Sequence, residues 1–173
     1  LREVVPLNRR LQERGQVELT TTPFFHPILP LLWDKRQARR AMPDVVLPDI
    51  DPYPDGEARA RWHIRQGLDN FERHFGWLPD GCWPAEGAVC DRTLALLEEA
   101  GFRWAATGQQ VLRNSLNHAL GTAKELPAHW AHRPYRVGEG ELCSFFRDDG
   151  LSDLIGFEYQ QWNADDAAAD FRQ

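Results

Sequence analysis

The feature that most constrains the fold of this chain is an alternation of strand-like and helix-like segments. The strand-like runs are residues 16–22, a short stretch before Trp83, residues 102–107 and residues 141–147. The helix-like runs are residues 1–14, 57–76, 91–101 and 109–120, and a further helix that begins over residues 151–157. This order predicts an α/β fold with mostly parallel strands and flanking helices. A complete eight-fold barrel takes about 250 residues, so we expect an incomplete barrel or a small open sheet.

Residues 57–76 form the clearest helix, because one apolar stripe recurs at helical spacing. The stripe consists of Ile64, Leu68, Phe71 and Phe75. Asp91 and Gly101 are the expected N-cap and C-cap of the following helix. The proline- and aspartate-rich residues 43–56 predict a long loop, and residues 132–147 predict a hairpin.

Composition limits the classes of partner. The 173 residues, 42% of them hydrophobic, suffice for one domain with a sizeable core. The net charge is −6 without a basic stripe, and no apolar run approaches the about 20 residues of a membrane span. We therefore expect neither a nucleic-acid partner nor a membrane segment. None of Cys82, Cys90 and Cys143 lies in a CxxC pair, which favours small buried thiols in a reducing, cytoplasmic setting.

Polar residues follow several of the predicted strands. His26 comes after residues 16–22, Glu86 after the strand that precedes Trp83, and Asp148 with Asp149 after residues 141–147. The carboxyl ends of parallel strands meet on one face, so we expect these side chains on the same face of the sheet. Two carboxylates beside aromatic rings suit cleavage of a glycosidic bond.

Each of these residues also has an ordinary structural explanation. Glu86 can cap the helix that begins near Asp91, because carboxylates favour helix N-termini. Asp148 and Asp149 can be turn and N-cap residues before Gly150.

The histidines have structural explanations too. His26, between prolines and aromatic residues, can serve as a structural hydrogen-bonding group. His129 and His132 have only weak metal-ligand spacing and no acidic partner at a fixed offset, so we expect no metal site there.

Four stretches together resemble family 57 of the glycoside hydrolases, the group of α-amylases, glucanotransferases, branching enzymes and amylopullulanases. They are GQVELTTTPFFHPILPLL, GCWPAEGAVC, AGFRWAATGQQVL and FFRDDGLSDLIGFEYQQW. They occur in the family's order along nearly the whole chain. The resemblance implies an incomplete (β/α)7-type barrel and a retaining mechanism on an α-glucan substrate, with no required metal or other cofactor.

The resemblance also implies roles for particular residues. Glu86 in WPAEG matches the family nucleophile, and Asp148 in FRDDGLSD matches the general acid/base best, with Asp149 as a one-residue alternative. His26 in PFFHP matches a histidine that faces the sugar. Trp83, beside the nucleophile, is expected to stack on the sugar or to wall its site.

Two family motifs have no counterpart here, namely a His-Gln-Pro-like segment on the opening strand and a late helical motif. Both ends of the chain also read as helices in progress. We therefore expect residues 1–173 to be part of a catalytic domain with little or no activity by itself. Two other functions stay open: a metal-dependent sugar deacetylase, and a non-catalytic carbohydrate-binding relative. Linkage specificity and oligomeric state also stay open.

Overall fold

The computed structural model describes residues 3–125 and 127–172 of the chain. The chain forms two compact units. Unit 1 consists of Leu1–Thr107 and Tyr135–Phe145, and unit 2 consists of Gly108–Pro134 and Phe146–Gln173. None of the helices in the described part of the chain is long and apolar enough to span a bilayer.

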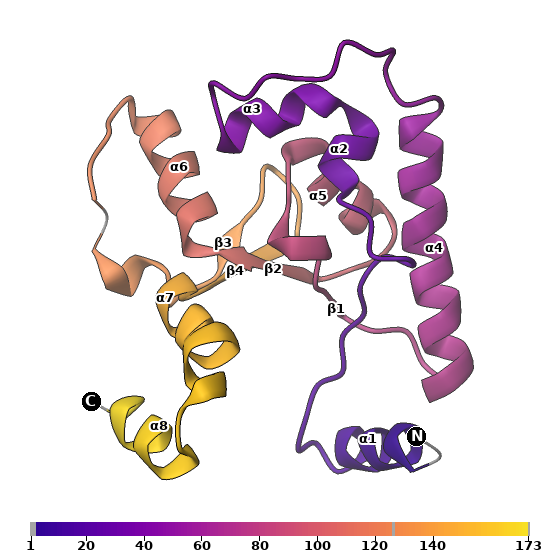
Figure 1. The fold of residues 1–173 in the computed structure, drawn as a ribbon. Coiled ribbons are helices and arrows are strands. Elements are labelled where there is room, and N and C mark those ends of the chain that lie inside the picture. The colour runs from indigo at the N-terminus through magenta and orange to yellow at the C-terminus, as the bar shows by residue number, and fades with distance from the viewer. Residues whose placement is uncertain (1–2, 126, 173) are drawn as a thin grey trace. The chain divides into compact units, whose positions relative to one another are not determined.

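A four-stranded sheet in the order β1-β2-β4-β3 lies mostly in unit 1 (Figure 1). Strand β1 (Gly81–Cys82) pairs in parallel with β2 (Trp104–Gly108), and β3 (Tyr135–Arg136) pairs antiparallel with β4 (Cys143–Arg147). The predicted hairpin over residues 132–147 is therefore confirmed. So is the short strand before Trp83.

The strand predicted over residues 16–22 is wrong as a regular strand. Only Thr21 pairs, through a single parallel bridge to Cys82 on β1. The next bond of a parallel ladder would need the backbone N–H of residue 23, and Pro23 has none. Pairing therefore stops after one bridge, although the segment still runs beside β1 and delivers the turn that follows it.

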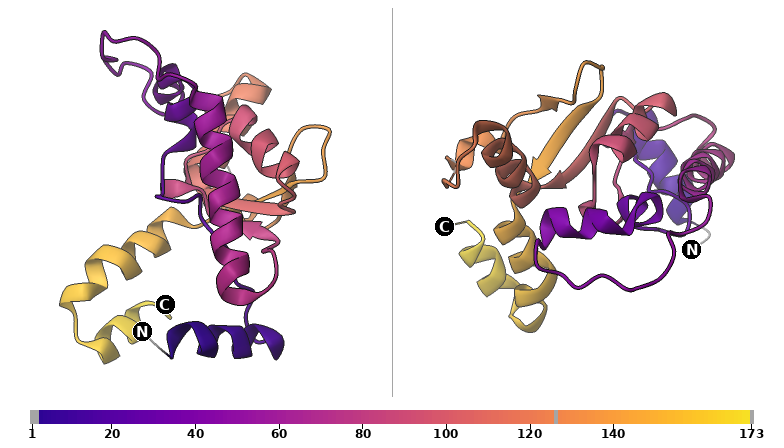
Figure 2. Two further views of the ribbon diagram at one scale, coloured as in Figure 1. Left: turned by 90° about the vertical axis from the view of Figure 1, so that its right-hand side faces the viewer. Right: turned by 90° about the horizontal axis from the view of Figure 1, so that it is seen from above.

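Helices flank the sheet of unit 1, and α4 lies beside its β1 end in Figures 1 and 2. The helical segments of unit 1 are α1 (Val4–Glu13), α2 (Leu29–Trp33), η1 (Lys35–Gln37), α3 (Ala38–Ala41), α4 (Gly56–Phe75), η2 (Ala85–Gly87) and α5 (Asp91–Glu99). Those of unit 2 are α6 (Gln109–Leu120), η3 (Ala128–Trp130), α7 (Asp149–Asp153), a π-helical turn η4 (Leu154–Glu158), η5 (Tyr159–Gln161) and α8 (Ala164–Asp170).

The apolar stripe of α4 packs as its spacing predicted. Ile64 and Phe71 are buried, Leu68 is half-buried against the core, and the helix ends at Gly76 in a left-handed conformation (φ 91°). The core of unit 1 joins α2, α4, α5 and the strands through Leu29, Ala60, Ile64, Cys82, Leu94, Leu96, Leu97, Phe102, Ala105 and Leu142. The predicted loop is confirmed over residues 43–55.

The caps of α5 differ from the prediction by one residue at each end. Cys90, not Asp91, is the N-cap, and it shares a capping box with Thr93, whose hydroxyl accepts from the Cys90 N–H at 2.9 Å. Ala100 is the C-cap, and Gly101 follows it. Asp91 instead occupies the first helical position, where its charge still favours the helix N-terminus.

Candidate functional site

The turn after Thr22 has an unusual backbone. Phe25 and His26 both adopt left-handed conformations, with φ of 61° and 52°. The His26 N–H donates to the Pro23 carbonyl at 2.9 Å, which closes the turn. Phe24 is fixed to α4 twice: its N–H donates to the His63 carbonyl at 2.9 Å, and its carbonyl accepts from His63 Nδ1 at 2.6 Å. Two neighbouring non-glycine residues are thus held in a conformation that such residues avoid.

A second unusual turn follows β1 and carries Glu86. Glu86 is itself left-handed, with φ of 54°, and so is Gly87, with φ of 66°. The buried hydroxyl of Thr107, on β2, donates to the Gly87 carbonyl and anchors this turn to the sheet. The conformation of Glu86 costs about 1–3 kcal/mol by itself. It leaves the Glu86 side chain 75% exposed while its neighbours Ala85 and Gly87 are buried.

The two turns meet through their polar side chains. His26 Nε2 lies 3.5 Å from Glu86 Oε1, and His26 Nδ1 hydrogen-bonds the Thr22 hydroxyl at 2.9 Å. The strand-end rule therefore brings His26 and Glu86 together in unit 1, as the sequence indicated.

The structural explanation of Glu86 as a helix cap is wrong. The backbone of the first turn of α5 is capped by Cys90 and Thr93 instead. Trp83, also from this turn, is half-buried, and its indole edge lies 3.6 Å from the position that a Cβ would take at Gly87. Its expected contact with a sugar stays a prediction.

Asp148 and Asp149 have different partners in unit 2. Asp148 is the N-cap of α7, and its Oδ1 accepts from the Leu151 N–H at 2.9 Å, so its predicted capping role is confirmed. Asp149 Oδ2 accepts from the Gln110 N–H at 3.1 Å, in the first turn of α6, and its Oδ1 lies 3.4 Å from Arg147 Nε. Asp149 thereby ties the start of α7 to the start of α6.

Glu86 and His26 belong to unit 1, whereas Asp148 and Asp149 belong to unit 2. The expected facing of Glu86 and Asp148 across one pocket therefore stays a prediction. Sequence reasoning missed Thr22 and Thr107, which anchor the two turns of unit 1. Thr107 lies near the carboxyl end of β2, so the rule that identified Glu86 also applied to it.

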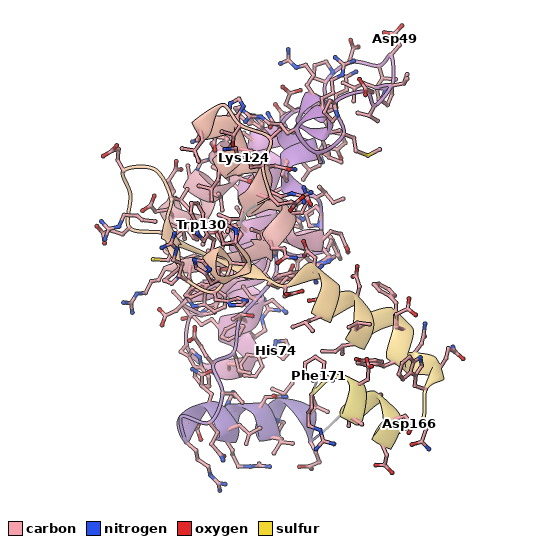
Figure 3. All side chains as sticks on the ribbon, turned by 90° about the vertical axis from the view of Figure 1, so that its left-hand side faces the viewer. Asp49, His74, Lys124, Trp130, Asp166 and Phe171 are labelled. Atoms are coloured by element: carbon pink, nitrogen blue, oxygen red, sulfur yellow. The ribbon has the colours of Figure 1, made fainter. Side chains whose placement is uncertain are left out.

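Each unit also contains a hollow. The hollow of unit 2, of about 160 Å³, is lined by Gln109, Gln110, Leu112, Arg113, Glu125, Pro127, Trp130 and Ala131. That of unit 1, of about 360 Å³, is lined by Val5, Thr20, Thr21, Thr22, Asn70, Phe71, His74 and Phe75. Trp130 and His74 are labelled in Figure 3. In neither hollow does Glu86 or Asp148 form part of the lining.

Cys82, Cys90 and Cys143 are free; Cys82 is buried, and burial raises the pKa of its thiol to about 12, so this thiol is unreactive. Among residues 3–125 and 127–172, no three His, Cys, Asp or Glu side chains gather in a way that could hold a metal ion.

Comparison with known proteins gives one family. The family model described as glycosyl hydrolase family 57 matches residues 1–173. No curated protein matches the chain by sequence.

Several solved structures share the fold. They include a branching enzyme from Thermococcus kodakaraensis (TM-score 0.60, 22% identity over 90% of this chain and 28% of that one) and the α-amylase AmyC from Thermotoga maritima (TM-score 0.58, 20% identity, 88% and 24%). A 4-α-glucanotransferase from Thermococcus litoralis also matches (TM-score 0.55, 21% identity, 88% and 19%). The chain thus spans about a quarter of the length of these proteins. Its small, mostly parallel sheet with flanking helices corresponds to a part of their (β/α)7-type barrel, which confirms the predicted fold class.

Proposed function

Because the chain belongs to glycosyl hydrolase family 57, we propose that it is part of the catalytic domain of an enzyme that hydrolyses or transfers glycosidic bonds of α-glucans. The solved structures of similar fold bear the names of an α-amylase, a branching enzyme and a 4-α-glucanotransferase, which supports this substrate class. Within this chain, the main support for the proposal is the contact between His26 and Glu86, which come from two strained turns.

In the proposed reaction Glu86 is the nucleophile. Its carboxylate attacks the anomeric carbon, the glycosidic bond breaks, and a covalent glycosyl-enzyme forms. The left-handed turn supports this role, because it projects the carboxylate into the open while its backbone is anchored by Thr107. Strain of this kind clusters at active sites, where the surrounding structure maintains it.

His26 is proposed to orient the nucleophile. When the Thr22 hydroxyl donates to Nδ1, a neutral imidazole carries its proton on Nε2, and Nε2 is the atom that faces Glu86. A neutral N–H beside the carboxylate fixes its direction and leaves its negative charge in place for attack. Trp83 is proposed to wall the sugar site on the side of the same turn.

Asp148 is proposed as the general acid/base. It protonates the leaving oxygen in the first step and takes a proton from water or an acceptor hydroxyl in the second. Its helix-capping bond uses Oδ1, so Oδ2 can carry the proton. Asp149 is held by Gln110 and Arg147, which favours a structural and substrate-bordering role over proton transfer. A retaining enzyme requires about 5–5.5 Å between the Glu86 and Asp148 carboxyl groups.

The same proposal places the protein in the cytoplasm and requires no metal. Free cysteines support a reducing compartment.

Chemical rescue of the nucleophile tests the function. In the full-length protein that contains this chain, Glu86→Ala should lose turnover of an aryl α-glucoside, and azide should restore it with formation of the inverted glycosyl azide. Azide then occupies the space of the missing carboxylate and attacks from its side. Wild-type rates in Glu86→Ala would contradict the assignment. Glucan binding by a wild-type protein without turnover would indicate a non-catalytic relative, and a stoichiometric metal with deacetylation would indicate a deacetylase.

A further inference from the structure

An exposed aromatic cluster adjoins the His26–Glu86 contact. It consists of Phe24, Phe25, Trp62 and His63. The ring centroids of Phe24 and Phe25 are 4.4 Å apart, those of Phe25 and Trp62 are 6.4 Å apart, and those of Trp62 and His63 are 4.9 Å apart. Phe25 is 78% exposed and Trp62 is 48% exposed. Both large rings thus present apolar surface outside the core of unit 1.

Phe25 lowers the stability of the fold in two ways. Its ring is exposed to solvent, although burying an aromatic ring would stabilise the fold. Its backbone is also left-handed, a conformation in which a bulky residue is strained. Yet the turn is firmly fixed, since the Phe24 backbone bonds His63 through both its N–H and its carbonyl. An outlier that the surrounding structure maintains in this way points to a role in binding.

We propose that Phe25 and Trp62 form a stacking platform for a glucose residue next to the one that Glu86 attacks. This inference rests on the proposed function and deepens it. Phe25 precedes His26, and His26 Nε2 is 3.5 Å from Glu86 Oε1, so the turn that carries Phe25 also contacts the reacting carboxylate. An α-glucan offers several rings in succession, and a second ring must lie beside the one at Glu86.

The chemistry around the platform suits a sugar better than a purely apolar ligand. The turn that carries Phe25 also brings together the Thr22 hydroxyl, the His26 imidazole and the Glu86 carboxylate. A sugar ring has an apolar face for stacking and hydroxyls at its edge for hydrogen bonds, so it matches this combination. The competing occupant is another segment of the full-length protein, because the chain spans only about a quarter of the length of the similar solved structures.

Binding measurements on the full-length protein in a Glu86→Gln background separate these occupants without turnover. Titration calorimetry with maltoheptaose should show about tenfold weaker affinity after Phe25→Ala or Trp62→Ala, and a smaller change with maltose. Phe25→Tyr keeps a stacking face and should keep the affinity, whereas Phe25→Leu keeps apolar bulk and should lose it. Leu78→Ala is the matched control, because Leu78 is 56% exposed and lies before β1, away from the turn that follows it.

Unchanged affinity in Phe25→Ala and Trp62→Ala overturns the inference. A lowered melting temperature with unchanged affinity also overturns it, because the rings then pack against another segment. If the wild-type enzyme is active but Phe25→Ala binds maltoheptaose as tightly as its parent, the platform is refuted and the proposed function stands. If the wild-type protein shows no turnover but Phe25→Ala still weakens maltoheptaose binding, the proposed function is refuted and the platform stands.

Discussion

His26 Nε2 lies 3.5 Å from Glu86 Oε1, and the two residues reach each other from left-handed turns that follow neighbouring extended segments. The bridge between Thr21 and Cys82 sets this contact, because it places the two segments side by side just before each turn begins. The geometry of the contact is therefore built into the sheet. Substitutions at either turn should change the rate of reaction more than the stability of the fold.

We predict that His26→Ala in the full-length enzyme lowers kcat by about 100-fold with little change in KM, because a positioned donor beside the reacting group is lost. Thr22→Val should lower kcat by about fivefold, since it removes one hydrogen bond that orients the imidazole. Steady-state kinetics on amylose measures both. His74→Ala is the control, because the His74 side chain hydrogen-bonds the Asn70 carbonyl on its own helix, α4. A His26→Ala enzyme within twofold of the wild-type rate would refute the orienting role.

The sequence predicted some features of this site and not others. Spacing identified α4 and its buried face, because a 3.6-residue period is a local property. The strand-end rule identified His26 and Glu86, because topology alone decides which residues emerge at one edge. The left-handed backbone of Phe25 was not predictable, because bulky residues avoid that region unless tertiary contacts such as Phe24–His63 maintain it.

Two local predictions failed for similar reasons. The run QVELTTT has the composition of a strand, but its pairing depends on Pro23, which ends the ladder after one bridge. Asp91 is the better N-cap by residue type, yet Cys90 takes the position because Thr93 completes a capping box with it. In each case the hydrogen-bonding capacity of a neighbouring residue, absent in Pro23 and present in Thr93, outweighed the intrinsic preference.

A network of ion pairs joins α4 to α5 and makes stability depend on pH. Glu57 accepts from Arg92 and from Arg61, and Glu99 lies 2.7 Å from Arg61 and 3.1 Å from Arg92. The hydrogen bonds from Arg92 and then Arg61 hold the pKa of Glu57 below its usual value, and that from Arg61 lowers the pKa of Glu99. A lowered carboxyl pKa gives stability that is present above the ordinary pKa and is lost as the pH falls through the folded-state pKa.

We therefore predict that Glu57→Gln lowers the melting temperature at pH 7, and that its difference from wild type shrinks as the pH falls below the ordinary pKa of glutamate. Because these side chains are at least partly exposed to solvent, the effect should be small and should weaken with added salt. Thermal unfolding of the full-length protein across this pH range measures it. Glu72→Gln on the same helix is the control. A difference that grows toward acid pH would contradict the assignment.

The last prediction separates Asp148 from Asp149 by the leaving group of the substrate. A general acid contributes about 10²–10⁴-fold to rate when the leaving oxygen must be protonated, and little when the leaving group is a stable phenolate. In the full-length enzyme, Asp148→Asn should therefore lose about 10³-fold on an α-glucan but far less in the first turnover of a p-nitrophenyl α-maltooligosaccharide, read as a burst of nitrophenolate. Asp149→Asn keeps an oxygen that can accept from the Gln110 N–H, so it should lose activity modestly and equally on both substrates. The reverse pattern would make Asp149 the acid/base, and equal losses in both variants would remove the pair from proton transfer.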